Sequence, residues 1–412
     1  MVRVRRSDDL AFISPGLMDE VIVNANQLEN SAQSTAACIR KTTLPFTVDP
    51  VLWRFQLPKW WRNHKGETKR NYTRLGTAYV KDTNIKMAGG PILETVPSDD
   101  EWCTLATNVI RYQRMRLLEV PTQLDLLDQS LPRELHPARL MAPALVAFSR
   151  VEDRINRLLA DASASAADGP IAAQVIVPAE RLADVHELDR LISSIPTDGI
   201  SSYFIWTPEV TEELLLADQE VFAALLHLIS TLAERGIAVG HQYANYSIAA
   251  LHDVGINAVA HHLGWVDKGE PAEEQRFMLR SCQTYVPGVR HCQRFPQATQ
   301  SGRNLDAQQY AERYCECSFC AGSFAAGQHP LDLLLEDELV VFSNGRNRRT
   351  PTSRAVAANT WHYLLSRRLE VKAFSELPAA EVIERDIARA SALAGDRDKE
   401  RLRRLANEIK SA

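Results

Sequence analysis

The sequence predicts an α/β fold made of repeated β-α units, and three observations point to it. Short β-branched or apolar runs alternate with segments of helical periodicity. Glycines such as Gly236 and Gly255 end helical segments directly before the next apolar run. Eight strand candidates occur, which is the number needed to close a (β/α)8 barrel of the TIM type.

The predicted strands and helices follow the chain from its first apolar runs to its charged end. The middle is clearest, because Phe222, Leu225 and Ile229 recur at helical spacing between two apolar runs. The Ala-Ser-rich residues 162–169 predict a surface loop, and the densely charged residues 380–409 predict a solvated covering helix or part of a dimer interface. The eight predicted strands are 21–24, 44–49, 117–120, 173–177, 202–206, 237–240, 256–262 and a segment near Tyr285.

Length and patterning divide the chain into three predicted parts. A chain of 412 residues with 45% hydrophobic content can fill a barrel with additions. Residues 1–300 form the predicted barrel, which carries a basic insertion at about 54–115. Residues 301–375 form a predicted zinc-binding subdomain, and residues 376–412 form a C-terminal helix.

Composition excludes some classes of protein. No run of about 18 or more apolar residues occurs, and residues 1–9 lack the apolar centre of a secretory signal. A membrane partner is therefore not expected. The seven cysteines are an odd number and three of them cluster, which fits a reducing compartment better than a disulfide framework. We therefore expect a cytoplasmic protein.

Three cysteines in the run Tyr-Cys-Glu-Cys-Ser-Phe-Cys form the most informative motif. Cys315, Cys317 and Cys320 have the C-x-C-x-x-C spacing with which thiolates close on one soft metal ion from a tight turn. A fourth ligand is needed, and His329 and His362 both compete for this position. A closed Cys3His shell leaves no place for a reacting water, so the predicted role of Zn²⁺ is structural.

Basic residues gather in two stretches, although the net charge of the chain is −5. Residues 54–86 carry nine Lys or Arg against two acidic residues, with aromatic residues between the charges. This composition is typical of a surface that binds a phosphate backbone and stacks bases, although a solvated loop can have the same charge. The predicted nucleic-acid contacts are Arg62, Lys65, Lys69, Arg70, Arg74, Arg346 and Arg348.

Polar residues end or follow several predicted strands, where a barrel places its active site. Each also has a simpler interpretation. Asp49 precedes a proline and fits a turn residue that bonds its own backbone, and adjacent histidines in one strand point to opposite faces. The polar residues in question are Asn24, Asn26, Gln27, Asp49, His241, Gln242, His261 and His262.

The order of these motifs resembles the tRNA-guanine transglycosylase family, which exchanges a guanine in nucleic acid for a 7-deazaguanine base. The C-x-C-x-x-C motif followed by Trp361-His362-Tyr363-Leu364 is similar to the family's zinc signature, which favours His362 over His329. Residues 24–28 resemble the family's Asn-Thr-Tyr-His-Leu segment. Residues 45–49 resemble the strand that ends in its Asp-Ser-Gly-Gly motif, so the resemblance gives Asp49 the acid/base role on the exchanged base.

The resemblance also implies where other site residues lie. Residues 255–262 correspond to the strand that carries the family's nucleophilic aspartate, but they contain no carboxylate. Asp267, five residues past that strand, is therefore the candidate nucleophile. The implied contacts to the base are Asn26, Gln174 and His241, and the implied sugar-phosphate or acid/base groups are His261 and His262.

Two functions remain open at this point. The first is a transglycosylase that inserts a 7-deazaguanine base, with DNA slightly favoured over tRNA because motifs of the tRNA enzyme are eroded while the zinc motif persists. The second is a catalytically silent barrel that binds nucleic acid or serves as a partner subunit. Either form could act as a homodimer or beside a companion modification subunit.

Overall fold

The computed structural model describes most of the chain, which forms two compact units. The first unit comprises Met1–Ile248 and Val254–Glu273, and the second comprises Ala249–Asp253 and Glu274–Ala412. The described residues are 1–4, 7–56, 61–63, 65–85, 97–118, 120, 134–208, 210, 215, 218–244, 246–262, 283–286, 291–294, 302–341, 347–390 and 396–411.

The first unit is built on a seven-stranded sheet in which neighbouring strands are parallel. The strand order is β3-β2-β1-β7-β6-β5-β4, so β1 joins the first three strands to the last four. Nearly every described strand residue is buried, as expected for a parallel sheet covered on both faces. The strands are β1 (Val2–Val4), β2 (Val21–Asn24), β3 (Phe46–Asp49), β4 (Ile171–Ile176), β5 (Ile200–Trp206), β6 (Ala238–Gln242) and β7 (Ile256–His262).

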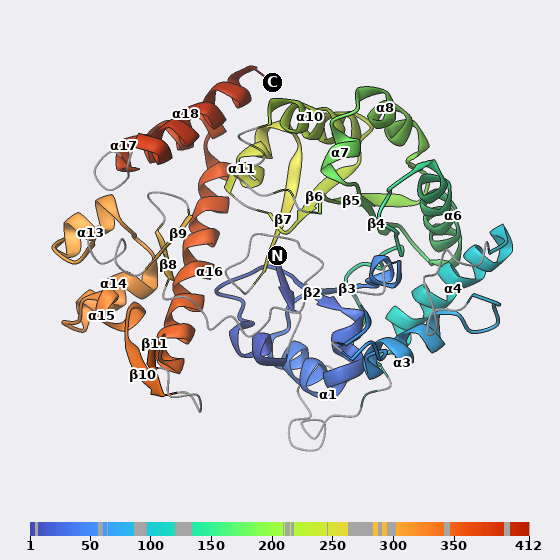
Figure 1. Cartoon of the computed structure of the whole chain (residues 1–412), viewed down its shortest axis with the longest axis horizontal. Helices are drawn as coiled ribbons and strands as arrows, with labels where there is room; N and C mark the ends of the chain where they lie inside the picture. Colours follow the sequence, from blue (N-terminus) through green and yellow to red (C-terminus); the bar gives the residue numbers. More distant parts are fainter. Residues whose placement is uncertain are drawn as a thin grey trace. The chain divides into compact units, whose positions relative to one another are not determined.

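Helices follow these strands and lie around the outside of the sheet (Figure 1). Their first turns carry the expected signals, since Ser98 and Ser149 each form a capping box with the glutamate three residues later. The helices of this unit are η1 (Ser7–Phe12), α1 (Ala25–Thr42), η2 (Leu52–Phe55), α3 (Arg70–Tyr79), α4 (Asp99–Met115), α6 (Arg150–Ala166), α7 (Ala179–Leu182), α8 (Val185–Ser194) and α10 (Gln219–Glu234). Two short helices, α11 (Tyr246–Ala249) and η4 (Ala250–Val254), follow at the unit boundary.

Side chains from four strands of the first unit's sheet, and from one neighbouring segment, meet on one face, which shows that the sheet is curled. These side chains form one buried cluster: Ile22, Met141, Ala172, Phe204 and Ala260. The cluster draws on β2, β4, β5, β7 and the segment that contains Met141. The concave face of the sheet therefore holds a packed apolar layer, and the residues at the strand ends lie beside it.

Both edges of this sheet contact one short segment. Thr47 of β3 forms a parallel bridge with Arg139, and Met141 forms a parallel bridge with Ala172 of β4. Backbone hydrogen bonds of 2.7 and 2.8 Å also connect residues 138–142 with the two edge strands. The edge strands therefore share a common neighbour.

The second unit combines helices with two antiparallel strand pairs. The strand β10 pairs with β11, and β8 pairs with β9. No helix in the described part of the chain is long and apolar enough to cross a membrane. The elements of this unit are β8 (Gln283–Val286), β9 (His291–Arg294), α13 (Ala307–Arg313), α14 (Ser318–Ala325), α15 (Pro330–Leu334), β10 (Asp337–Val341), β11 (Asn347–Pro351), α16 (Ser353–Glu376), α17 (Ala379–Ala390) and α18 (Asp396–Ser411).

Two predicted strands differ from the structure. In the run 117–120, residues 117 and 118 lie in a turn after α4, and Leu117 and Val120 are buried without strand pairing. The strand near Tyr285 exists as β8, but it pairs antiparallel with β9 and is not part of the parallel sheet. The other six predicted strands lie in that sheet, and β1 at Val2–Val4 was not predicted. The α/β prediction is therefore confirmed. The described parallel sheet has seven strands, so it does not show a closed eight-stranded barrel.

Two other segments also differ from their predictions. The Ala-Ser-rich segment predicted as a loop continues α6 to Ala166, because alanine has the highest helix propensity and Ser165 bonds back to the Asp161 carbonyl (2.9 Å). The charged segment 380–409 contains two helices, α17 and α18, where one was predicted. Residues 301–375 and 376–412 belong to the same compact unit.

Replacement of Gly240 by alanine tests the packing on the concave face. An added Cβ at Gly240 would lie 2.6 Å from the Phe204 ring, which stands opposite it in the strand register. We expect Gly240→Ala to lower the free energy of unfolding by about 1–3 kcal/mol, measured by urea denaturation. Gly169→Ala is the matched control, since nothing lies within 4 Å of its Cβ. Equal stability of the two variants would contradict this packing.

Candidate functional site

The buried guanidinium of Arg3, on β1, is the centre of a polar cluster in the first unit. Its side chain is fully buried and forms an ion pair with Asp49 of β3. Arg3 Nη1 donates to Gln242 Oε1 on β6 (2.7 Å), and Nη2 donates to Asn24 Oδ1 on β2 (2.8 Å). One side chain therefore joins four strands. Loss of one partner of a buried ion pair typically costs about 3–5 kcal/mol, because the other charge stays buried.

The partners of Arg3 share a position in the fold. Asn24, Asp49 and Gln242 are each the last residue of their strand. Parallel strands end at the same edge of a sheet, so these side chains converge there. Asn24 also precedes α1 in the N-cap position, but its side chain makes no capping bond because its oxygen accepts from Arg3.

Both carboxylate oxygens of Asp49 are engaged. Oδ2 pairs with Arg3, while Oδ1 accepts hydrogen bonds from Gln174 Nε2 and the Val51 backbone N–H, both at 2.9 Å. The hydrogen bond to the Val51 backbone is the one expected if Asp49 is a turn residue, which was one interpretation of its place in the sequence. It holds Val51 at a φ of 50°, a left-handed conformation that β-branched residues rarely adopt. Asp49 thus fills a turn role and also meets Gln174, a second predicted site residue.

Aromatic rings extend from this cluster. The Arg3 guanidinium lies 4.7 Å from the ring centroid of Tyr243, which follows β6 at a φ of 58°. Centroids of Tyr243 and Trp206 are 5.1 Å apart, and those of Trp206 and Trp53 are 4.6 Å apart. The Arg54 guanidinium lies 4.8 Å from the Trp53 ring. Flat apolar surfaces therefore lie beside hydrogen-bonding groups, a combination found in small-molecule sites.

The structure does not bring His241 and His261 to the Arg3 cluster. Successive strand residues point to opposite faces, so His241 faces away from its neighbour Gln242, which contacts Arg3. His241 is only 5% exposed, and this burial lowers its pKa to about 4, so the ring is neutral at pH 7. His261 Nδ1 lies 3.0 Å from the backbone oxygen of Ala244.

Three other predicted residues lie elsewhere. Asn26 is the second residue of α1 and is buried, and its backbone oxygen accepts from Asn71 (3.5 Å). His262 ends β7 in register with Arg3, but its side chain is outside the described part of the structure. Asp267, the candidate nucleophile, lies outside the described residues.

The predicted nucleic-acid contacts of the first unit gather around the start of α3. Arg62 and Thr68 form an antiparallel bridge that closes a tight loop, and Lys69 occupies the N-cap of α3. The Arg62 guanidinium lies 4.7 Å from the Trp61 ring. The exposed members of the group are Lys65, Arg70 and Arg74. A loop and the first turns of one helix therefore present these cations together.

The second basic stretch contains the other two predicted nucleic-acid contacts, Arg346 and Arg348. Arg348 belongs to β11, although its side chain is not described, and Arg346 lies outside the described residues. The neighbouring Arg349 is exposed and pairs with Asp337 of β10 (2.6 Å). This ion pair offsets part of the positive charge that the sequence suggested here.

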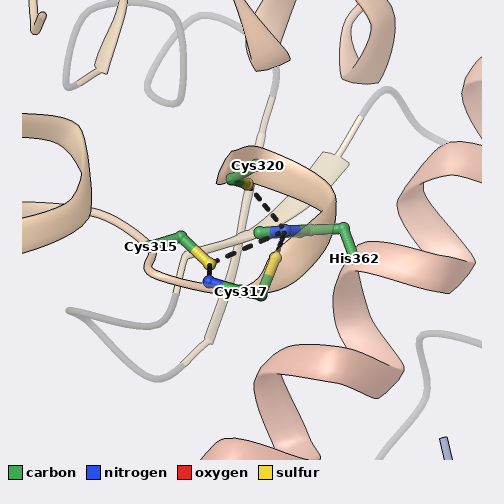
Figure 2. A group of neighbouring side chains, drawn as sticks. All are labelled: Cys315, Cys317, Cys320 and His362. Carbon is green, nitrogen blue, oxygen red and sulfur yellow. Dashed lines mark hydrogen bonds between the residues drawn. The ribbon is translucent and has the colours of Figure 1, made fainter. Parts of the chain in front are cut away.

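The second unit contains a buried four-residue cluster, shown in Figure 2: Cys315, Cys317, Cys320 and His362. His362 Nδ1 lies 3.4 Å from the sulfur atoms of Cys317 and Cys320, and 3.8 Å from that of Cys315. A tetrahedral zinc with Zn–S of about 2.3 Å and Zn–N of about 2.0 Å requires sulfur-to-nitrogen distances of about 3.5 Å. The four side chains therefore fit one metal ion.

Local structure explains how these ligands meet. Cys315 and Cys317 lie in the turn before α14, and Cys320 lies in its first turn, while His362 comes from the long helix α16. His329 does not join the cluster, because its Nδ1 accepts the Leu331 backbone N–H at the start of α15 (3.2 Å). The choice of His362 over His329 agrees with this arrangement.

The environment of Cys315 favours a thiolate. Ser366 Oγ lies 3.5 Å from the Cys315 sulfur, and the Cys317 backbone N–H donates to the same atom (3.4 Å). Burial opposes ionisation, but hydrogen bonds from Cys317, Cys320 and Ser366 hold the pKa of Cys315 well below its ordinary value. A thiolate is the form that binds metal.

Arg3, the centre of this cluster, was not predicted, whereas Asn24 and Gln242 were among the polar residues singled out at strand ends. Arg3 lies in the run Val2-Arg3-Val4, where apolar residues flank one charge, and this alternation is the signal of a short strand with a charge on its other face. For Gln242, the same alternation shows that His241 and Gln242 must face opposite sides of the sheet, but it does not say which of the two faces the site. Asn24 has a second interpretation from the sequence, because its position also suits the N-cap of a helix.

The chain was compared with protein families and with curated proteins. No family model matches the chain, and a search of curated proteins finds no match. The functional argument therefore depends on the two clusters themselves.

Substitution of the two competing histidines tests the metal cluster. We expect the purified protein to hold about one zinc per chain and His362→Ala to lose it, because three thiolates alone leave the shell open. Mass-spectrometric metal analysis after dialysis measures the content. The matched variant His329→Ala should keep the metal, since His329 caps α15 and packs against Tyr310 and Phe324 without joining the cluster. Metal loss in His329→Ala, or retention in His362→Ala, would contradict the cluster.

The buried neutral His241 should make stability depend on pH. Its folded pKa of about 4 lies below an unfolded value of about 6.5, so the unfolded state binds the proton first and stability falls as pH drops through this window. The loss is on the order of 3 kcal/mol, measured by urea denaturation between pH 7 and pH 4. His241→Leu should not show this pH-dependent loss of stability. A variant in which the exposed His227 is replaced should still show it. Identical pH profiles for wild type and His241→Leu would refute the assignment.

Proposed function

We propose that the chain is a guanine-transglycosylase-like barrel that exchanges a guanine in nucleic acid for a 7-deazaguanine derivative, with DNA favoured over tRNA. The observation that carries this proposal is the contact between Asp49 and Gln174. These residues are 125 positions apart in the chain, and Gln174 Nε2 lies 2.9 Å from Asp49 Oδ1 in the buried interior of the first unit. Both were singled out as site residues from the sequence alone.

The chemistry of this pair suits a guanine-type base. Guanine carries an N2 amino donor as well as O6 and N7 acceptors. A carboxylate accepts hydrogen bonds from such donors, and a side-chain amide donates to such acceptors. Asp49 and Gln174 supply one group of each kind. In the proposed complex, an incoming base takes the place of their mutual bond, and Trp206 provides an aromatic surface nearby.

The proposed barrel is completed by residues 139–141 as its eighth strand. These residues bridge to β3 on one side and to β4 on the other, both in parallel orientation. With them included, the eight strands follow one another in chain order, and β7 meets β1. This is the connectivity of a (β/α)8 barrel, whose catalytic residues lie at the carboxyl ends of the strands.

Base exchange needs a group that attacks the sugar and a group that handles the proton of the base. Asp49 is the one carboxylate among the last residues of β1–β7, and we assign it the proton-transfer role. The proposed nucleophile is Asp267. Arg3 holds Asp49 in place through a fully buried ion pair. Asp49 must therefore give up part of its present hydrogen bonding when substrate enters.

The remaining parts of the proposal concern nucleic acid and metal. The cations around the start of α3 are proposed to contact the phosphate backbone, and Lys65, Arg70 and Arg74 are exposed for this. The metal of the Cys3His cluster is proposed to be Zn²⁺. A closed, buried shell of three sulfurs and one nitrogen suits a structural ion, which stabilises the fold of the second unit.

A second function, a catalytically silent nucleic-acid-binding barrel, is favoured by one observation. The charge of Asp49 is already neutralised by Arg3, and its oxygens are occupied. In this alternative, Asp49 is a structural group that joins β1 to β3. An activity assay separates the two functions.

The assay follows radiolabelled guanine into tRNA and, separately, into duplex DNA, using the zinc-loaded protein. We expect label in one polymer, and we expect Asp49→Asn to reduce incorporation by roughly 100-fold or more because proton transfer is lost. Thermal denaturation of each variant checks its fold. Label in neither polymer would favour the silent barrel.

Glu20→Gln is a matched control for Asp49→Asn. Glu20 is also a buried carboxylate, paired with Arg139 (2.7 Å) and with Thr47 (2.7 Å), but it precedes β2 and so lies at the opposite ends of the strands. It should lower stability without removing activity. Full activity in Asp49→Asn would remove Asp49 from the mechanism, and equal loss in both variants would point to stability alone.

A further inference from the structure

Several buried donors at the strand ends of the first unit have no acceptor among the described residues. They are Asn24 Nδ2, Gln242 Nε2, Trp206 Nε1 and Arg3 Nε. Each parent side chain is at most 1% exposed. Asn24, Trp206 and Gln242 are the last residues of β2, β5 and β6. Buried polar groups almost always have partners, so four unpaired donors in one region call for an explanation.

The orientation of the two amides is fixed by Arg3. A guanidinium only donates hydrogen bonds, so the oxygens of Asn24 and Gln242 must face Arg3. Their NH2 groups then necessarily point elsewhere. An amide flip would place NH2 against guanidinium and is excluded. The unpaired groups are therefore all donors, and what they lack is an acceptor.

The charge of this region is also unbalanced. Arg3 and Arg54 supply two guanidiniums, and Asp49 is the one carboxylate paired with either of them in the described part of the chain. Arg54 donates to the Tyr72 hydroxyl and lies over Trp53. The pKa of Arg3 is raised: burial opposes the rise, Tyr243 and Asp49 cause it, and the positive charge of Arg54 opposes it. The two guanidiniums are thus within electrostatic reach of each other.

We propose that the carboxyl end of this sheet binds a small oxyanion, the phosphate or carboxylate group of a ligand, through Asn24, Gln242, Trp206 and Arg3. Such a group offers only acceptors and carries the negative charge that the region lacks. A cation or a donor-rich ligand would leave these N–H groups unpaired. Water could accept the hydrogen bonds but would leave the positive charge unmatched. This site goes beyond base exchange, because it requires neither Asp267 nor a reaction.

Isothermal titration calorimetry with inorganic phosphate, acetate and guanosine 5′-monophosphate tests the site. We expect phosphate or acetate to bind wild-type protein and to raise its melting temperature. Tighter binding of the nucleotide than of phosphate would identify a nucleotide phosphate as the source of the oxyanion. No binding of either simple anion at about 10 mM would overturn the proposal and assign the donors to water.

The Gln242→Glu variant gives the sharpest comparison. It keeps an oxygen facing Arg3 but replaces the NH2 group with an acceptor and adds negative charge, so anion affinity should fall at least about tenfold while the fold is retained. Gln328→Glu makes the same charge change on an exposed residue and should leave affinity within about twofold. Unchanged affinity in Gln242→Glu would overturn the proposal.

A second variant keeps the test decisive if Gln242→Glu fails to fold. Trp206→Phe removes the Nε1–H donor and retains an aromatic ring against Tyr243 and Trp53. Its phosphate or acetate affinity should fall several-fold with little change in melting temperature. Affinity equal to that of wild type would remove Trp206 from the site and count against it.

Discussion

One buried positive charge constrains the first unit more than any other interaction. Arg3 is fully buried, so its guanidinium must find acceptors inside the fold, and it finds them on β2, β3 and β6. The register of β1 follows from this requirement. A slip of one residue would turn Arg3 toward the other face of the sheet and bring Val2 or Val4 among the polar side chains. The strand-end cluster and the sheet therefore specify each other.

Patterns that repeat over many residues were predictable from the sequence. Alternating apolar and helical segments located six strands of the parallel sheet, because burial on both faces leaves continuous apolar runs. The three cysteines of the Cys3His cluster were also predictable, since they lie within six residues, whereas the choice of His362 over His329 as fourth ligand came from the family resemblance. Gln174 and Asp49 were named separately, and the fold shows that they touch.

Features that depend on very short segments or on facing direction were not predictable in the same way. The strand β1 has three residues, too few for periodicity to separate it from a leader segment. Leu117 begins an apolar run that suggests a strand, but the residue lies in a turn after α4 with its side chain buried. His241 was predicted to be a site residue because it is polar and lies at the end of a strand. The pleat of β6 turns its side chain away from Arg3. Tertiary contacts decide each of these cases.

The place of β1 in the sheet has a consequence for folding on the ribosome. Met1 donates its amino group to the Val259 carbonyl across a separation of 258 residues, and β1 pairs with both β2 and β7. At about 5–20 residues per second, synthesis of that span takes roughly 13–50 s. Until β7 emerges, β1 has only one neighbour and Arg3 lacks its contact on β6. Closure of the sheet is therefore a late, long-range event, and the edge of β1 that pairs with β7 stays open until that strand has been made.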